Sequence, residues 1–568
     1  MLVGYVSDEN YVAVVDAALE FQQNGRTVAT ARSTASGRVF ADVVPGEYHV
    51  TLARPGFGAK RVIAWIVDGA PVSFRLLSDG LLGYMWPKWV RAGERSEFRV
   101  HSVGPYRLSL WRYGKTKEFV RLLGWFDEHG PRAVMQITPD GDYTQTGVRW
   151  NSVGYGSSHH GQRVEAPAAS GLYYFHAKAA SGAFFSFPWI VAPAAPRAQV
   201  AVLACSITWN AYNNFGGRSN YINPSGLPPE PTVNARQELS RYQLGDSLKV
   251  WSPPDEAYPP LSFDRPEIGN HVPEDEVVTH PIGGRIASAQ APGEWRLLAW
   301  LEREGFPYDY YAEPQLHTGA LDLDRYRVLI LPIHPEYWSR LMYERVKEWV
   351  HHRGGRLMYL GGNGLNCEVE FLDEHTLRFK THLDSEAGSL GMQDPDRPGA
   401  YFESRFHRTV ESEANLLGVV CSETGIMTAA PYRAVDAAHW AFAETGLRDG
   451  DLFGEASLHE RVPGGASGHE TDKMSRFSPA GTRLLAKGIN PDDGGSEMTY
   501  YETATGGAVF SVGSITYCAS LLVDPAISRI TRNVLVRFLK NTPREAPPPR
   551  AGKGRVRGRC EGRRGTLG

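Results

Sequence analysis

The sequence predicts a multidomain protein in which two N-terminal β-sandwich modules precede a larger α/β domain. Up to about residue 195, short extended runs alternate with turn dipeptides, and no long helical pattern occurs. Beyond that point, continuous apolar runs typical of strands buried on both faces alternate with amphipathic helical patterns. A chain of 568 residues is also too long for a single hydrophobic core. The predicted segments are 1–80, 81–195, 196–540 and 541–568.

Period-two patterns and turn residues define the two sandwich modules. In the first module, Asn24-Gly25, Ser36-Gly37 and Pro45-Gly46 separate runs whose apolar residues alternate with polar ones. The second module continues this pattern with aromatic-rich strands, which a second sandwich accounts for most simply. A stretch rich in proline and alanine, Pro193 to Ala198, then resembles a linker.

The third segment, 196–540, is predicted to contain alternating strands and helices. The runs "QVAVLAC" and "YRVLILP" are buried strands, and Ser339 to His352 is an amphipathic helix. Asp524 and Pro525 begin a second helix near the end of this segment. Residues 541–568 are rich in Pro, Gly and Arg with little to bury, so a disordered basic tail is expected there.

Composition narrows the class of function. The chain carries 60 basic and 63 acidic side chains, a balance that argues against nucleic-acid binding and favours a small-molecule substrate. No apolar run long enough for a membrane span and no signal-peptide pattern is visible, so a cytoplasmic location without membrane contact is expected. The five cysteines share no metal-type spacing and are expected to be reduced thiols.

Polar side chains follow several of the predicted buried strands. His334 and Glu336 come directly after "VLILPI", Asn363 follows "LMYLGG", and Tyr212 lies shortly after "VAVLAC". Ligands of open α/β sheets bind beyond the carboxyl ends of the strands. Each residue alone has a structural explanation, such as a helix cap or a half-buried aromatic. Together they predict a functional site at one edge of the sheet.

Six motifs follow one another between Val200 and Lys540: "TWNAYNNFGGRSNY", "SFDRP", "HPEYWS", "GGRLMYLGGNG", "GGASGHETDK" and "YYETATGGAVFSVGSITYCASLL". Together they resemble the large (beta) subunit of N,N-dimethylformamidase and its relatives. This resemblance implies a domain similar to class I glutamine amidotransferases, with an α/β/α architecture. Separately, "SGRVFADVVPGEYHVTL" in the first module resembles prealbumin-like regulatory sandwiches.

The formamidase resemblance implies a mononuclear ferric (Fe3+) site with two tyrosine ligands and one glutamate. The glutamate corresponds to Glu336 and the first tyrosine to Tyr212. For the second tyrosine Tyr221 fits best, with Tyr242 or Tyr258 as alternatives.

The same resemblance implies three catalytic residues, Glu470, His334 and Asn363. The implied activity is hydrolysis of a small amide at a linear C–N bond other than a peptide bond. A small accessory subunit and a homo-oligomeric assembly are also expected. The sequence departs from the pattern of that family near Tyr500 and after "GGNG". The substrate therefore need not be dimethylformamide.

The chemistry of such a set is consistent with amide hydrolysis. Ferric iron is a hard cation that favours anionic oxygen ligands and can hold tyrosine as phenolate far below its free pKa of about 10. A bound metal also acidifies water and polarises a carbonyl. Glu470 or His334 could move the proton, and Asn363 could orient the amide or hold the oxyanion.

Two other interpretations remain open from the sequence. In the first, Cys205 or Cys367 acts as a nucleophile with His334 and Glu336, although neither cysteine lies in a Gly-x-Cys-x-Gly elbow. In the second, the chain is a non-catalytic carbohydrate-binding protein with an inactive amidotransferase-like domain. The histidine pair 159–160 would then be a candidate ligand loop.

Overall fold

A computed structural model gives the arrangement of most of the chain. Tyr242, the histidine pair 159–160 and the predicted tail 541–568 lie outside the described residues. No helix in the described part is long and apolar enough to cross a membrane. The described residues are 1–126, 135–150, 162–222, 226–228, 230–233, 258–280, 287–381, 392–394, 397–422 and 424–540.

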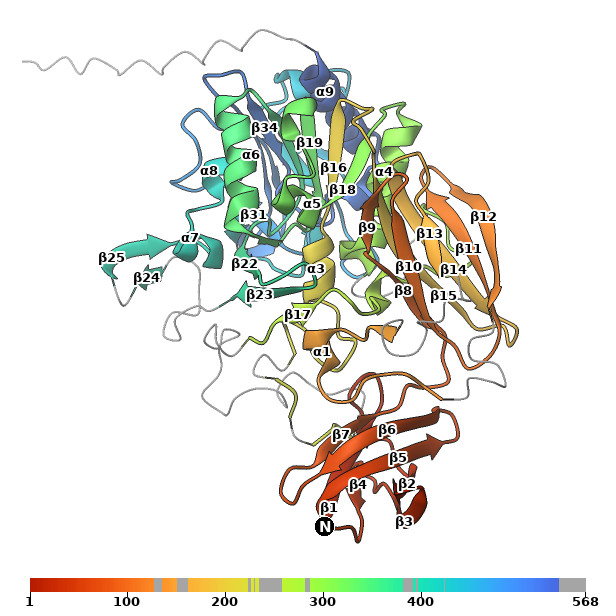
Figure 1. The fold of residues 1–568 in the computed structure, drawn as a ribbon. Helices are drawn as coiled ribbons and strands as arrows, with labels where there is room; N and C mark the ends of the chain where they lie inside the picture. Colours follow the sequence, from red (N-terminus) through yellow and green to blue (C-terminus); the bar gives the residue numbers. More distant parts are fainter. Residues whose placement is uncertain are drawn as a thin grey trace, which may run out of the picture.

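The first part of the chain forms two small facing sheets around a shared core (Figure 1). One sheet has the strand order β4-β1-β7 and the other β3-β2-β5-β6. Asn24 and Gly25 both have positive φ values, 50° and 75°, so they form the two-residue hairpin turn that the sequence predicts. The strands are β1 (Leu2–Ser7), β2 (Ala18–Gln23), β3 (Arg26–Arg32), β4 (Arg38–Phe40), β5 (Gly46–Arg54), β6 (Gly58–Ile66) and β7 (Val72–Arg75).

A second pair of sheets follows, with a core rich in aromatic side chains. A three-stranded sheet of order β13-β10-β8 packs on a five-stranded sheet of order β12-β11-β14-β15-β9. Phe98, Phe175 and Trp189 are buried between them. The strands are β8 (Leu82–Trp86), β9 (Trp89–Arg91), β10 (Arg95–His101), β11 (Tyr106–Tyr113), β12 (Lys117–Phe126), β13 (Arg163–Glu165), β14 (Gly171–Ala179) and β15 (Phe184–Ala192).

A nine-stranded mixed sheet forms the centre of the remaining chain. Five neighbouring strands run parallel in the order β18-β16-β19-β21-β34, and four antiparallel strands, β33-β32-β28-β29, extend the sheet. The strands are β16 (Val200–Ala204), β18 (Asp309–Ala312), β19 (Val328–Ile333), β21 (Arg356–Gly361), β28 (Tyr432–Ala434), β29 (Leu452–Phe453), β32 (Arg483–Gly488), β33 (Glu497–Glu502) and β34 (Ala508–Ser511).

Both faces of this sheet are covered, which explains why its strands are continuous apolar runs. Val202 and Ile330 belong to one core together with residues of α4 (Ala291–Arg303) and α9 (Pro525–Leu539). Leu329 and Leu357 belong to a second core, which includes residues of α5 (Glu313–Thr318) and α6 (Arg340–His352). The side chains of each strand therefore alternate between two helical layers.

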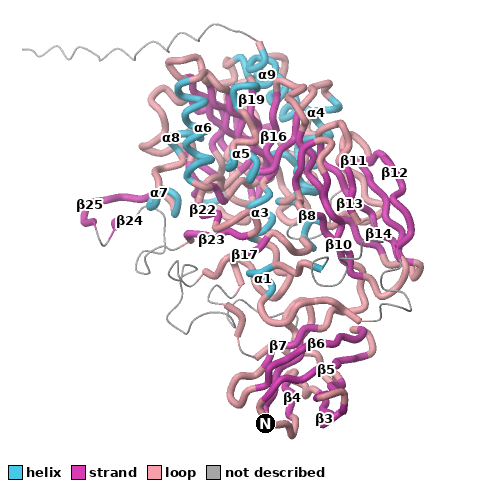
Figure 2. Tube along the Cα trace, in the orientation of Figure 1, coloured by secondary structure: helices cyan, strands magenta, loops and turns pink. Residues whose placement is uncertain are grey.

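Shorter elements surround the carboxyl ends of the parallel strands. A small sheet of order β17-β23-β22-β20 crosses this edge, and helix α3 follows β16 directly. Taken together, the described residues form a multidomain and mostly β protein, as the sequence predicts (Figure 2). The division at residues 80, 195 and 540 stays a prediction. The short elements are α1 (Tyr143–Thr146), α3 (Ser206–Ala211), β17 (Leu261–Ser262), β20 (Tyr337–Trp338), β22 (Cys367–Phe371), β23 (Thr376–Lys380), β24 (Met392–Asp394), β25 (Arg397–Phe402), α7 (Arg405–Thr409), α8 (Ala414–Leu417), β26 (Val420–Ser422), β27 (Ala429–Ala430), β30 (Ser467–Gly468) and β31 (Thr471–Lys473).

A buried polar group joins the second pair of sheets to the segment around β17. Asp264, which is 1% exposed, accepts a 2.7 Å hydrogen bond from the Tyr84 hydroxyl of β8. Its carboxylate also pairs with the guanidinium of Arg99 on β10. Glu97 is a second, more distant partner of Arg99 at 3.4 Å. Asp264 therefore neutralises a cation that is largely withdrawn from water.

Replacing Asp264 by alanine should destabilise the protein by about 3 kcal/mol, because Arg99 then stays buried without its closer carboxylate. The exposed pair between Arg32 and Asp16 provides the control, and Arg32→Ala should cost less than about 1 kcal/mol. Urea unfolding followed by circular dichroism compares the two variants. Equal stability of Asp264→Ala and Arg32→Ala would contradict the assigned role.

Candidate functional site

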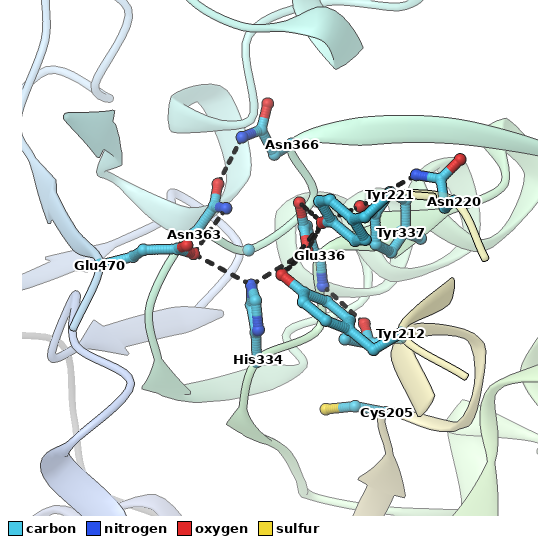
Figure 3. Close-up of polar contacts among 12 residues, drawn as sticks. Cys205, Tyr212, Asn220, Tyr221, His334, Glu336, Tyr337, Asn363, Asn366 and Glu470 are labelled. Atoms are coloured by element: carbon cyan, nitrogen blue, oxygen red, sulfur yellow. Dashed lines mark hydrogen bonds and ion pairs between the residues drawn. The ribbon is translucent and has the colours of Figure 1, made fainter. Parts of the chain in front are cut away.

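The polar residues that the sequence places after buried strands meet at one edge of the parallel sheet. His334 and Glu336 follow β19, Asn363 follows β21, and Tyr212 ends helix α3, which itself follows β16 (Figure 3). The three strands are neighbours and run parallel, so their carboxyl ends deliver these side chains to the same place.

Three oxygen-bearing side chains lie in contact at the centre of the site. The Tyr212 hydroxyl donates a hydrogen bond to Glu336 Oε2 over 3.0 Å, and the Tyr221 hydroxyl lies 3.0 Å from each carboxylate oxygen of Glu336. The two hydroxyls are themselves 3.0 Å apart. Tyr221, the residue that fits the second tyrosine best, is thus in contact with Glu336. Tyr258 is buried, and Tyr242 lies outside the described residues.

Without a cation, these tyrosines are neutral phenols. Burial raises the pKa of Tyr212 well above its ordinary value, and the nearby Glu336 raises it further. The same two causes raise the pKa of Tyr221. Protons and hydrogen bonds therefore hold the set together when no metal ion is present.

The oxygen set nevertheless fits a small, hard cation. Neighbouring ligands of an octahedral ion with bonds of about 2.0–2.1 Å lie about 2.9 Å apart, close to the separations among Tyr212, Tyr221 and Glu336. Two phenolates and one carboxylate supply three negative charges, which match a trivalent ion. Two of these three ligands are tyrosines, so the set is not a cluster of His, Cys, Asp and Glu side chains. The described residues contain no cluster of three or more of those four residue types that could hold a metal ion.

His334 lies between two carboxylates. Its Nε2 atom is 3.2 Å from Glu336 Oε2 and 3.2 Å from Glu470 Oε2, although neither approach is aligned as a hydrogen bond. Burial alone would lower the pKa of His334, but Glu336 and Glu470 outweigh it and raise that pKa to about 10. An imidazolium ion at this position balances the negative charge of the two acids.

Glu470 is held ionised by its neighbours. Burial tends to raise its pKa, but His334 and the Asn363 side chain, whose Nδ2 donates over 2.8 Å, lower that pKa to about 2. The side chain of Glu470 is 16% exposed, whereas that of His334 is 2% exposed. Glu470 is therefore a carboxylate that a small molecule can approach.

Helix α3, which carries Tyr212, is anchored at its beginning by two buried acids. Glu294 accepts a 3.0 Å hydrogen bond from the Cys205 backbone amide, and Glu313 accepts a 2.7 Å bond from that of Ile207. Carboxylates favour the beginning of a helix because unpaired amide groups point outward there. The two acids thus fix the direction in which this short helix carries Tyr212 toward the site.

A buried arginine organises the chain beyond α3. Arg265 donates to the backbone carbonyls of Asn210, Asn213 and Phe215, at 3.3, 2.9 and 2.6 Å. These bonds satisfy carbonyl groups left unpaired where the helix ends. They fold back the loop that leads from Tyr212 to Tyr221.

A second buried acid, Asp472, positions the turn that contains Asn363. It accepts a 2.8 Å bond from the Asn363 backbone amide and a 2.7 Å bond from the Tyr359 hydroxyl. The Tyr359 oxygen in turn accepts a 2.7 Å bond from the Gly364 amide. Asn363 is thereby held at a φ of 47°. The sequence analysis missed Asp472, although it lies two residues after Glu470 in "GHETDK".

Neither Cys205 nor Cys367 lies in surroundings that favour a reactive thiolate. Cys205 donates a hydrogen bond from Sγ to the Pro332 carbonyl over 3.0 Å, and burial raises its pKa well above the ordinary value. Cys367 is also buried, with Sγ 3.4 Å from the Glu368 carbonyl oxygen. Reactive cysteines need an environment that favours the thiolate, so this geometry disfavours a cysteine nucleophile.

Gly362 is required by a close approach between two segments of the site. A Cβ atom added there would lie 2.5 Å from the Glu470 backbone oxygen. Gly362→Ala should therefore push Glu470 away from Asn363 and cost about 1–3 kcal/mol. Gly104→Ala is the control because nothing lies within 4 Å of its added Cβ. Thermal denaturation should show a lower midpoint for Gly362→Ala alone, and equal midpoints would contradict the assigned packing.

Two solved structures show a distant likeness to this chain. The β-galactosidase of Rahnella sp. R3 matches with a TM-score of 0.25 at 12% identity, over 44% of this chain and 27% of that one. A β-galactosidase of Bacillus circulans sp. alkalophilus matches with a TM-score of 0.25 at 14% identity, over 43% and 26%. These scores are too low to support an argument about fold or function.

Comparisons of sequence are more informative. The N,N-dimethylformamidase beta subunit of Paracoccus aminophilus is 30% identical over 295 residues, and that of an Alcaligenes species is 29% identical over 295 residues. Each match covers 45% of this chain and 37% of the relative's length. The family model described as N,N-dimethylformamidase beta subunit-like, C-terminal, matches residues 111–529. The family expected from the motifs is thus confirmed, and the chain belongs to the N,N-dimethylformamidase beta subunit-like family.

Proposed function

We propose that this protein is an iron-dependent hydrolase of a small amide, acting on a linear C–N bond other than a peptide bond. The observation that carries the proposal is the contact of Tyr212, Tyr221 and Glu336 at separations of 3.0 Å. The relatives named N,N-dimethylformamidase beta subunit support the amide chemistry. The parallel strands with helices on both faces are consistent with a class I glutamine amidotransferase-like domain.

Tyr212, Tyr221 and Glu336 would hold ferric iron (Fe3+) through their three oxygens. When bound, the ion supplies Lewis acidity that polarises a carbonyl and lowers the pKa of water. The buried His334 ring leaves both nitrogen atoms without an aligned hydrogen-bond partner in the structure.

Glu470 would move the proton in this reaction. It accepts a proton from the attacking water as the water oxygen bonds to the amide carbon. It returns that proton to the amine nitrogen as the C–N bond breaks. Asn363 keeps the carboxylate oriented through its 2.8 Å hydrogen bond, and His334 stabilises the ionised form from the other side.

The assembly is part of the same proposal. Because the relatives are named as beta subunits, we infer that this chain also associates with a smaller accessory subunit. Its substrate would be a small amide, in keeping with the names of the relatives.

Purified protein should contain about one iron per chain and show visible absorption from phenolate-to-iron charge transfer. Glu336→Gln and Tyr212→Phe should each lose most of the iron and the absorption, because each removes an anionic ligand. Tyr432→Phe is the control, since the Tyr432 hydroxyl is buried against the Val512 carbonyl over 2.8 Å. Metal analysis and absorption spectra test this directly. Colourless, iron-free wild-type protein after expression with iron would refute the proposal.

Glu470→Gln should keep its iron but hydrolyse amides about 10²–10⁴-fold more slowly, because glutamine cannot take up the proton. Release of free amine from a panel of small formamides and acetamides measures kcat. The iron content of the variant separates loss of chemistry from loss of the metal. A variant with unchanged kcat would assign the proton transfer to another group.

A further inference from the structure

We propose that Tyr337 is a positioning residue whose hydroxyl donates a hydrogen bond to the metal-binding oxygen of Tyr221. This inference rests on the proposed function, because Tyr337 would act on an oxygen of one of the proposed iron ligands. Tyr337 follows Glu336 directly in the chain, and neither the family match nor the relatives' names assign it a role.

The geometry places the two hydroxyls in direct contact. The Tyr337 and Tyr221 hydroxyl oxygens lie within hydrogen-bonding distance, and Tyr337 is 1% exposed (Figure 3). On its other side, the Tyr337 hydroxyl accepts a 3.2 Å bond from Nδ2 of Asn220. Asn220 precedes Tyr221 in the chain, so both partners of Tyr337 come from one loop.

The backbone and ring of Tyr337 are fixed independently of these hydrogen bonds. Strand β20 pairs in parallel with β22, with Tyr337 opposite Cys367. The ring packs edge-on against Phe379, with centroids 4.9 Å apart and an interplanar angle of 88°. The hydroxyl is therefore held in place even when the Tyr221 oxygen changes its charge.

Proton counting gives the direction of the hydrogen bond. A tyrosine hydroxyl has one proton, and the side-chain amide nitrogen of Asn220 can only donate. The proton of Tyr337 is thus left for the Tyr221 oxygen. An oxygen that binds a metal ion as phenolate has no proton, so it accepts this bond. Such a charge-assisted bond is stronger than one between neutral groups.

This bond has an electronic consequence at the site. A donor to the phenolate oxygen withdraws electron density from it, which raises the energy needed to move an electron from phenolate to iron. Hydrogen bonds from outside the ligand set commonly tune a metal site in this way. Removing the hydroxyl of Tyr337 should therefore shift the charge-transfer absorption to lower energy without removing the ion.

Tyr337→Phe in the full chain tests the inference. The expected result is full iron content, an absorption band moved to lower energy, and kcat reduced about 10-fold with a smaller change in KM. Asn220→Ala should move the band less, since it removes only the donor that orients Tyr337. Tyr432→Phe is the matched control and should leave the band in place. Circular dichroism confirms that each variant is folded.

The outcomes separate the two proposals. A wild-type protein with iron and a band, but with no shift in either Tyr337→Phe or Asn220→Ala, overturns the inference alone. Loss of iron in a folded Tyr337→Phe also overturns it, because Tyr337 would then be a ligand itself. Absence of both iron and band in the wild type overturns the proposed function.

Discussion

The contact between Glu336 and two tyrosine oxygens is the interaction on which the rest of the site depends. Three electron-rich oxygens separated by 3.0 Å are stable in a buried place only if protons or a cation lie among them. In the structure the phenol protons fill this role, and His334 adds positive charge beside the carboxylate. A trivalent ion could replace the phenol protons without rearranging the side chains.

Much of the neighbouring structure serves to hold this contact in place. Two acids fix the start of α3, Arg265 turns the chain after it, and Asp472 ties the turn of Asn363. Backbone strain lies at the same edge. Ile333, a β-branched residue, has a φ of 48° immediately before His334. Strain of this kind persists only where the surroundings impose it, which is typical of functional sites.

The sequence predicts those parts of the site that depend on position along a strand. His334, Glu336 and Asn363 could be found because each follows an apolar run, and the helix start at Asp524 could be found from residue type. Other contacts leave no such signal. Tyr337 is adjacent to a strong candidate, but which way its hydroxyl points is decided by a loop more than one hundred residues earlier, at Asn220.

Contacts between residues that are far apart in the chain could likewise not be predicted from the sequence. Asp264 meets Tyr84 across 180 residues of chain, and no periodicity links the two positions. Asp472 lies near Glu470, but its partners at Tyr359 and Asn363 are set by the meeting of β31 with the turn after β21. The local sequence pattern indicates which residues are buried and where turns occur, whereas contacts between distant residues depend on tertiary packing.

The division of roles among neighbouring strands explains why the site depends on sheet register. The segment after β16 supplies the phenols, β19 supplies the carboxylate and imidazole, and β21 supplies the amide of Asn363. Because side chains alternate along a strand, a shift of one residue between β19 and its neighbours would exchange the two buried faces. Both cores of the sheet oppose such a shift, since Ile330 and Leu329 belong to different ones. The hydrophobic layers therefore set the distance between the proposed ligands and Asn363, the residue that orients Glu470.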